Sequence, residues 1–212
     1  MNPLEIKELL ILICTELVVC RDLINMEAIS KYYYKIIKTN TWSHLNIHIE
    51  MDKDLILMRK NYNFNKMNLS RTSVTDTSVS LLTNLHTLNL WGTKVTDASI
   101  SLLKNLHTLE LGGTKVTDAS VSLLTNLHTL DLWGTSVTDA SVSLLTNLHT
   151  IDLSETSVTD ESVSLLTKLH TLNLSWTKVT DASVLLLTKL HTLDLSWINV
   201  TDQCKKLLRT KR

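Results

Sequence analysis

Hydrophobic and polar positions repeat along most of the chain with a period of 21 residues. One unit reads Leu85-His-Thr-Leu-Asn-Leu-Trp-Gly-Thr-Lys-Val-Thr-Asp-Ala-Ser-Ile-Ser-Leu-Leu-Lys-Asn105, and it returns at Leu106, Leu127, Leu148, Leu169 and Leu190. A degenerate copy precedes these units, because apolar residues from Phe64 to Val74 fall in the same columns. Leucines first alternate, which predicts a short strand, and apolar residues then recur every three positions, which predicts a short helix.

Each position in the unit has an expected structural role. Leu88 and Leu90 should point into a core while Asn89 faces the open, concave side of the strand. Thr96 should cap the following helical turn, with Asp97 placing negative charge at its N-terminus. One threonine per unit stands in the turn after the strand, where we expect its hydroxyl to bond backbone groups: Thr72, Thr93, Thr114, Thr135, Thr156 and Thr177.

The period and the frame L-x-x-L-x-L-x-x-T-x-V resemble the leucine-rich repeat. The resemblance implies an α/β solenoid of about seven short units over residues 64–212, because one unit cannot bury its apolar stripe alone. Lys205, Lys206 and Arg209 lie near the end of the chain, where we expect a polar cap on the solenoid. A nuclear-import signal or a site for an anionic partner is the alternative.

The first part of the chain lacks this repeat. Residues 1–43 show apolar residues at helical spacing, as in Leu9, Ile13 and Leu17, and predict an all-helical segment. Residues 44–63 then alternate like a strand before a second helical pattern, so we expect a degenerate repeat that connects the two parts.

The order Pro3-x-Glu5-Ile6, Asp22-Leu23, Ser30-Lys31 and Trp42 resembles the F-box, a helical motif that docks onto the Skp adaptor of cullin-type ubiquitin ligases. This resemblance implies adaptor contacts through the faces that carry Pro3, Leu23 and Ile29. An F-box followed by repeats with a V-T-D return segment resembles the F-box/LRR proteins. The near-identical units and the Asn-, Ile- and Lys-rich first third are similar to such proteins from giant viruses that infect amoebae.

Composition excludes several function classes. With 21 basic and 21 acidic residues, the chain has no net charge that would draw it to nucleic acid or to a membrane surface. Four glycines and three cysteines leave no phosphate loop, disulfide framework or cysteine-rich zinc module. The short apolar run from Leu9 to Cys14 follows acidic residues and resembles neither a signal peptide nor a membrane span. We therefore expect a cytoplasmic protein, in the host cell if viral, with the nucleus as the alternative.

Six of the eight histidines share one column: His86, His107, His128, His149, His170 and His191. Neighbouring strands lie about 4.8 Å apart, so a ladder is expected rather than a converging metal site. No nucleophile elbow, zinc-protease motif or phosphate loop occurs in the sequence. We predict no enzyme, no metal and no cofactor.

Positions that differ between units are the ones able to discriminate a partner. The mid-strand column reads Asn68, Asn89, Glu110, Asp131, Asp152, Asn173 and Asp194. Trp91 and Trp133 stand two residues after this column, and Trp176 and Trp197 one place further. We interpret Glu110, Asp131, Asp152, Asp194, Trp91 and Trp133 as a surface for a basic protein target, although solubilising acids and tryptophans that cover strand edges would give the same pattern.

Two functions fit this organisation. The first is a substrate receptor of a cullin-type ubiquitin ligase, in which the F-box holds the adaptor and the repeats hold the target. The second is a protein-interaction scaffold whose N-terminal helices only cap the solenoid.

Overall fold

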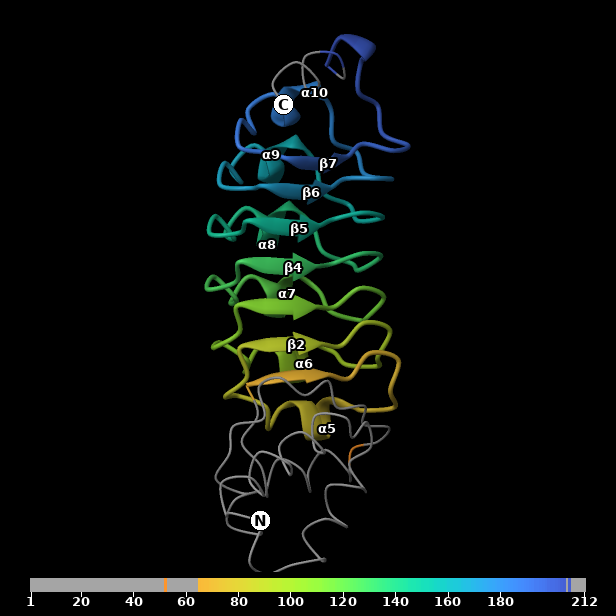
Figure 1. Cartoon of the computed structure of the whole chain (residues 1–212). Coiled ribbons are helices and arrows are strands. Elements are labelled where there is room, and N and C mark those ends of the chain that lie inside the picture. The colour runs from red at the N-terminus through yellow and green to blue at the C-terminus, as the bar shows by residue number, and fades with distance from the viewer. Residues whose placement is uncertain (1–51, 53–64, 205, 207–212) are drawn as a thin grey trace, which may run out of the picture.

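The structure is a computed structural model that describes residue 52, residues 65–204 and residue 206. In this part the chain winds into a stack of similar coils, with the strands on one side and the helices on the other (Figure 1). The strands are β1 (Lys66–Asn68), β2 (Thr87–Asn89), β3 (Thr108–Glu110), β4 (Thr129–Asp131), β5 (Thr150–Asp152), β6 (Thr171–Asn173) and β7 (Thr192–Asp194). The helices are α5 (Asp76–Val79), α6 (Asp97–Ile100), α7 (Asp118–Val121), α8 (Asp139–Val142), α9 (Asp160–Val163) and α10 (Asp181–Val184).

The seven strands form one parallel sheet in the order of the sequence, from β1 to β7. Each residue pairs with its equivalent in the next coil, as Leu88 does with Leu109 and Leu109 with Leu130. The predicted solenoid of one strand and one short helix per unit is confirmed. We call the solvent-facing side of β1–β7 the strand face.

The core consists of the predicted leucine, valine and isoleucine columns. In one coil, Leu88, Leu90, Val95 and Ile100 are all 0% exposed. Burying each such side chain contributes roughly 1.5 to 3 kcal/mol, and most of the contacts come from the coils above and below. The last strand is less well covered, because Leu193 is only partly buried.

The sequence analysis did not single out one apolar column that lies in solvent. The unit contains two successive leucines after each helix; the second, such as Leu103, is buried, whereas the first is not. The first leucine is 43% to 54% exposed in six successive coils: Leu81, Leu102, Leu123, Leu144, Leu165 and Leu186. The solenoid therefore carries a second repeating surface besides the strand face.

Residues 1–43, with Pro3, Leu23 and Ile29, and nearly all of 44–63 lie outside the described residues. Asp52 is described: its carboxylate accepts hydrogen bonds from the backbone and hydroxyl of Thr75 and from the hydroxyl of Ser78. Asp76 accepts the equivalent bonds from the next coil. Asp52 thus occupies the position that an aspartate takes in every following coil. Within the described residues, no helix combines the length and the apolar character needed to cross a membrane.

Candidate functional site

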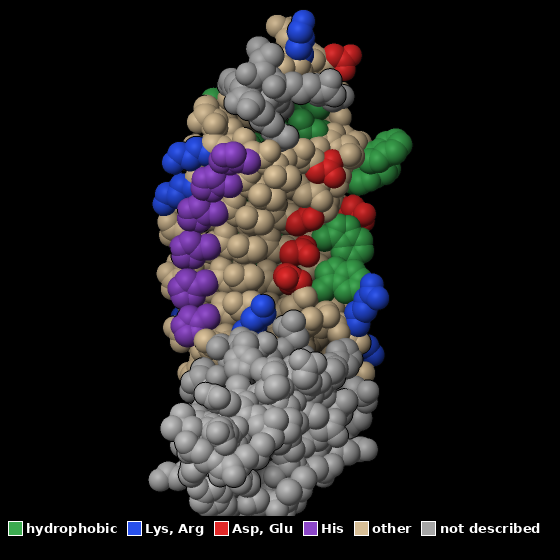
Figure 2. All heavy atoms as spheres, viewed as in Figure 1, with side chains coloured by type: hydrophobic (Ala, Val, Ile, Leu, Met, Phe, Trp, Pro, Cys, Tyr) green, Lys and Arg blue, Asp and Glu red, His purple; other side chains and the backbone are tan. Residues whose placement is uncertain are grey.

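The two margins of the strand face differ in chemistry. Figure 2 shows histidines in a column along one margin, acidic side chains along the other, and hydrophobic side chains beyond the acids. The candidate target-binding residues belong to the second margin.

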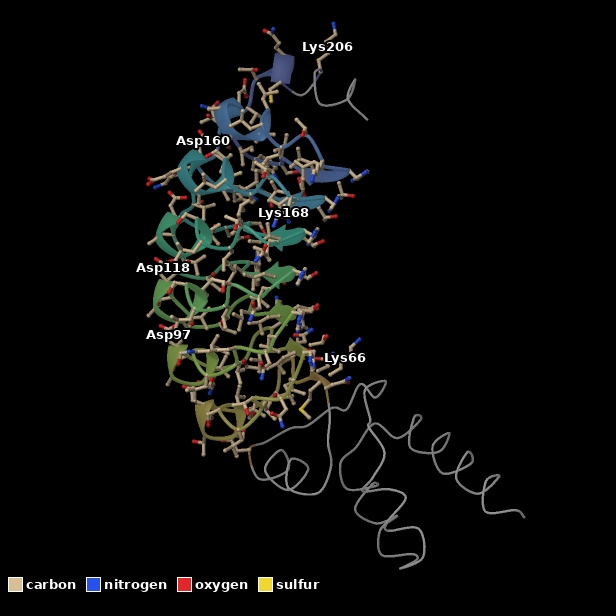
Figure 3. The ribbon with its side chains drawn as sticks, turned by 90° about the vertical axis from the view of Figure 1, so that its left-hand side faces the viewer. Lys66, Asp97, Asp118, Asp160, Lys168 and Lys206 are labelled. Carbon is tan, nitrogen blue, oxygen red and sulfur yellow. The ribbon has the colours of Figure 1, made fainter. Side chains whose placement is uncertain are left out.

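The aspartates on the helix side have a structural role. Asp97 Oδ1 accepts bonds of 2.9 Å from the backbone N–H of Thr117 and 2.5 Å from the hydroxyl of Ser120, both in the next coil. Thr96 caps α6 as predicted, since its side chain accepts a bond from the N–H of Ala98. The sequence analysis expected Asp97 to place negative charge at the N-terminus of its own helix. The structure adds a second role, because its carboxylate also joins two coils. Figure 3 labels Asp97, Asp118 and Asp160 on this side, away from Lys66 on the strand side.

These bonds change the acidity of the aspartates. Partial burial acts to raise the pKa of Asp97, but the hydroxyl of Ser120 and the backbone and hydroxyl of Thr117 outweigh it, and the pKa lies below its ordinary value of 3.8. Hydrogen bonds from the next coil likewise lower the pKa of the equivalent carboxylates. We call this set the aspartate ladder: Asp52, Asp76, Asp97, Asp118, Asp139, Asp160 and Asp181.

The threonines of the turn are structural, as predicted. The hydroxyl of Thr93 donates to the carbonyl of Leu90 at 2.7 Å, and each equivalent threonine makes the same bond. Their side chains are buried. Each hydroxyl thus satisfies a backbone carbonyl at the end of a strand.

Three of the four predicted acids form a contiguous group. Glu110, Asp131 and Asp152 stand side by side on β3, β4 and β5, in register. A side-chain amide bounds the group at each end, since Asn89 Nδ2 donates to Glu110 Oε2 and Asn173 Nδ2 to Asp152 Oδ2. We call Glu110, Asp131 and Asp152 the acidic triplet. Asp194 lies outside it, beyond Asn173 and exposed on β7.

The mid-strand column also stabilises the end of each strand. Asp131 Oδ1 accepts a bond of 2.8 Å from the backbone N–H of Trp133, two residues on. Three asparagines in this column accept the same bond through their amide oxygens at 2.9 to 3.0 Å: Asn68, Asn89 and Asn173. Asparagine therefore satisfies the structural requirement, and the negative charge of Asp131 is not needed for it.

The middle carboxylate carries its charge in an unfavourable environment. Burial raises the pKa of Asp131, the N–H of Trp133 partly opposes this, and the charges of Asp152 and Glu110 raise it further. The contrast is Asp194, where the hydroxyl and backbone N–H of Ser196 hold the pKa below its ordinary value. Asp131 is therefore the member of the triplet whose negative charge is disfavoured by its surroundings.

Trp91 and Trp133 lie beside the triplet and stack on each other, although they are two coils apart. Their ring centroids are 5.8 Å apart and their planes differ by 20°. Gly112 in the intervening coil makes this possible, because a Cβ there would lie 2.6 Å from Cδ1 of Trp91. The guanidinium of Arg71 covers Trp91 as well, at 4.4 Å from the ring centroid.

This packing shows that the two tryptophans contact each other and Arg71, while their role in binding a target stays a prediction. Both side chains are only partly exposed, and Trp91 is engaged by Arg71 and by Trp133. The sequence analysis missed Arg71 and Gly112, although the glycine in a column that otherwise holds Trp or Ser was a visible signal. Trp133, two residues after Asp131, is the tryptophan closest in sequence to the acidic triplet.

The histidines form the predicted ladder. Successive imidazole rings from His86 to His191 are stacked, with centroids 5.4 to 5.6 Å apart. Parallel rings do not converge on one point as tetrahedral ligands must. In the part of the chain that the structure describes, no group of three or more His, Cys, Asp or Glu side chains is arranged to hold a metal ion.

Comparisons with known proteins agree on the fold. A family model for the leucine-rich repeat matches residues 165–187. No curated protein matches the sequence significantly. Among solved structures, an internalin C2 from Listeria monocytogenes is similar with a TM-score of 0.58 and 21% identity, over 81% of this chain and 84% of that one.

Two ligand complexes are similar as well. A complex of TLR13 with single-stranded RNA matches with a TM-score of 0.53 and 21% identity, over 74% of this chain and 28% of the receptor. A plant peptide hormone receptor, RGFR1 in complex with RGF2, matches with a TM-score of 0.51 and 20% identity, over 75% of this chain and 29% of the receptor. This chain thus spans less than a third of either receptor, and at such identities the likeness concerns the fold alone. With the 21-residue register of its seven parallel strands, the chain contains a leucine-rich-repeat solenoid.

Proposed function

We propose that the solenoid is a protein-binding module whose strand face holds a basic segment of a target against the acidic triplet. The observation that supports this proposal most strongly is the carboxylate of Asp131. It accepts a structural hydrogen bond from Trp133 that asparagine accepts equally well in three other coils, so the structure does not require a charge here. Burial and two neighbouring charges disfavour that carboxylate. A cation from a partner would relieve this repulsion, since an opposite charge nearby favours the ionised form.

The spacing of the acids sets the size of the segment. Neighbouring strands lie about 4.8 Å apart, so Glu110 and Asp194, four coils apart, are separated by about 19 Å. An extended chain advances about 3.3 Å per residue, so roughly six residues would span this distance. Exposed ion pairs contribute only about 0 to 1 kcal/mol each, so the acids should set orientation and association rate while Trp133 contributes more to affinity.

The same charges argue against nucleic acid as the ligand of this face. Glu110, Asp131 and Asp152 would meet a phosphate backbone with like charge. Protein–nucleic acid affinity instead depends on lysines and arginines that neutralise phosphates. A basic protein segment fits the triplet, and single-stranded RNA does not.

The resemblance of residues 1–43 to the F-box extends the proposal. It supports a role as substrate receptor of a cullin-type ubiquitin ligase, with Pro3, Leu23 and Ile29 toward a Skp adaptor. The solenoid would then bring its target near the ligase without chemistry of its own. A scaffold without adaptor binding is the second candidate, and the location in a host-cell cytoplasm stays a prediction.

A pull-down from host lysate with identification by mass spectrometry tests both the strand-face binding site and the ligase role. The wild-type chain is compared with Asp131→Asn/Asp152→Asn and with Glu161→Gln, an exposed acid at the start of α9 that serves as control. We expect a partner with a basic segment that the double variant loses and the control keeps. A partner retained by all three chains would contradict the strand-face proposal.

A Skp adaptor in the wild-type pull-down, absent after deletion of residues 1–43, would support the ligase role. Failure of the folded full-length chain to capture its host adaptor would contradict that role and favour the scaffold.

A further inference from the structure

The turn that follows each strand contains one residue with left-handed backbone conformation. Three central coils have glycine there, Gly92, Gly113 and Gly134, with φ of 61° to 66°. The coil of β1 has Arg71, with φ of 57°, and the last three coils have Glu155, Trp176 and Trp197, with φ of 56° to 60°. Bulky side chains are rare in this region because Cβ meets the backbone, whereas glycine adopts it freely.

The conformation is imposed by the coil stack, not chosen by these side chains. The backbone N–H of Gly134 donates to the carbonyl of Ser154 at 3.0 Å, and that of Glu155 donates to Ser175 at 3.0 Å. The N–H of Trp176 likewise donates to Ser196 at 3.2 Å. Since the bond is the same with glycine, the large side chains add nothing to the backbone arrangement.

The two tryptophans are also poorly buried. Trp176 is 57% exposed and Trp197 is 76% exposed, and their rings stack with centroids 5.1 Å apart. Hydrophobic side chains protrude at this margin of the strand face, with acidic side chains next to them (Figure 2). A strained backbone that presents exposed aromatic rings favours a functional explanation over a packing one.

An open pocket of about 400 Å³ adjoins the pair, and it is lined by Glu155, Thr156, Ser157 and Trp176. Its lining includes the acidic residue Glu155 and the aromatic residue Trp176, and a planar cation prefers the combination of a carboxylate and an indole. The molecule already contains such a contact, in which the guanidinium of Arg71 lies 4.4 Å from the centroid of Trp91.

We propose that Glu155 and Trp176 form a pocket for the guanidinium of an arginine on the protein partner. The guanidinium would lie on the indole of Trp176 and pair with the carboxylate of Glu155, while Trp197 supports Trp176 from its stacked side. The identity of the partner rests on the proposed function, whereas the pocket itself is separate from the acidic triplet. Arginine is favoured over lysine because its flat group stacks on an aromatic face and is more weakly hydrated.

The test uses the full chain and the probe acetyl-Gly-Gly-Arg-Gly-Gly-amide, followed through the indole N–H signals in two-dimensional NMR. Single Trp→Phe variants assign those signals. We expect a saturable shift at Trp176, with at least a fivefold weaker effect from the same peptide with neutral citrulline in place of arginine. Glu155→Gln should weaken binding at least threefold, and the control Glu161→Gln, at an exposed acid at the start of α9, should leave it unchanged. Equal shifts with arginine and citrulline, or a response confined to Trp91 and Trp133, would overturn the proposal.

Trp176→Gly separates a binding role from a structural one. Glycine suits the left-handed backbone, so this variant should lose the peptide response while its thermal midpoint stays equal to or above that of the wild type. A lower midpoint would show that the Trp176–Trp197 stack serves the fold, and it would count against the pocket. If the arginine peptide binds at Trp176 but the pull-down partner ignores the acidic triplet, the pocket stands and the strand-face proposal fails.

Discussion

Asp131 Oδ1 accepts a 2.8 Å hydrogen bond from the backbone N–H of Trp133, and this bond requires an oxygen but not a charge. Asn89 makes the equivalent bond to the N–H of Trp91 at 2.9 Å. The carboxylate of Asp131 is therefore held in place by a contact that a neutral residue provides elsewhere in the same column. A substitution by asparagine can therefore remove the negative charge of Asp131 while it keeps the hydrogen bond.

Asp131→Asn should stabilise the protein. The amide keeps the bond to Trp133 and removes repulsion from Glu110 and Asp152, so the free energy of unfolding at pH 7 should rise by about 0.5 kcal/mol, a small value because solvent screens a partly exposed group. Because burial and those charges raise the pKa of Asp131, the cost of its charge is present above that raised pKa and absent below the ordinary value of 3.8. Urea denaturation at pH 7 and pH 3.5 checks both statements. A less stable variant at pH 7 would mean that the charge serves the fold.

Asp118 should be far more sensitive than Asp131. It accepts bonds from the backbone N–H of Thr138 at 2.9 Å, the Thr138 hydroxyl at 2.7 Å and the Ser141 hydroxyl at 2.5 Å, and Ser141 is fully buried. Asp118→Ala leaves a buried hydroxyl without its acceptor, which costs about 1 to 3 kcal/mol. A double-mutant cycle with Ser141→Ala should show a coupling above about 0.5 kcal/mol, and additive effects would contradict a direct role in joining coils.

The aspartate ladder predicts loss of stability in acid. Burial acts to raise the pKa of Asp139, but the bonds from Ser162 and Thr159 lower it below the ordinary value of 3.8. A carboxylate with a depressed folded-state pKa stabilises fully above its unfolded pKa, and that contribution is lost as the pH falls through the folded value. The denaturation midpoint should therefore be flat near neutral pH and fall below about pH 4. Circular dichroism between pH 2 and pH 7 tests this, and Asp118→Asn should show a shallower fall than the wild type.

Central and terminal positions of the solenoid should differ strongly. Leu132 is 0% exposed in the middle of the stack, so Leu132→Ala should cost roughly 2 to 5 kcal/mol. Lys206 is exposed near the end, and Lys206→Ala should be neutral within about 0.5 kcal/mol. Chemical denaturation of both variants measures the difference. Equal effects would contradict a cooperative stack.

The fold could be predicted because one pattern is repeated. The period of 21 fixes the register, so that Leu109 pairs with Leu88 and Leu130, and each apolar column has one place in the stack. The histidine ladder and the turn threonines follow from the same argument, since identical residues at identical positions face one another in neighbouring coils.

The site could be predicted only in part, because its geometry depends on contacts that periodicity does not encode. The stack of Trp91 on Trp133 needs Gly112 between them. The guanidinium that covers Trp91 comes from Arg71 in the preceding coil, where no aromatic residue draws attention to it. The hydrogen bond that the Ser120 hydroxyl donates to Asp97 crosses between coils, while the sequence alone suggested only that Asp97 places negative charge at its own helix. Side-chain direction across a coil boundary was the missing information.

The most direct test of the central claim is the association rate of a six-residue peptide of alternating lysine and arginine, measured by stopped-flow tryptophan fluorescence at low and high salt. The account predicts that Asp131→Asn/Asp152→Asn slows association several-fold at low salt and flattens its salt dependence, because electrostatic steering acts mainly on this rate. Trp133→Ala should instead speed dissociation, and Glu161→Gln should match the wild type. An association rate that is the same in the wild type and the double variant, at both salt concentrations, would contradict the claim that the acidic triplet receives a basic partner.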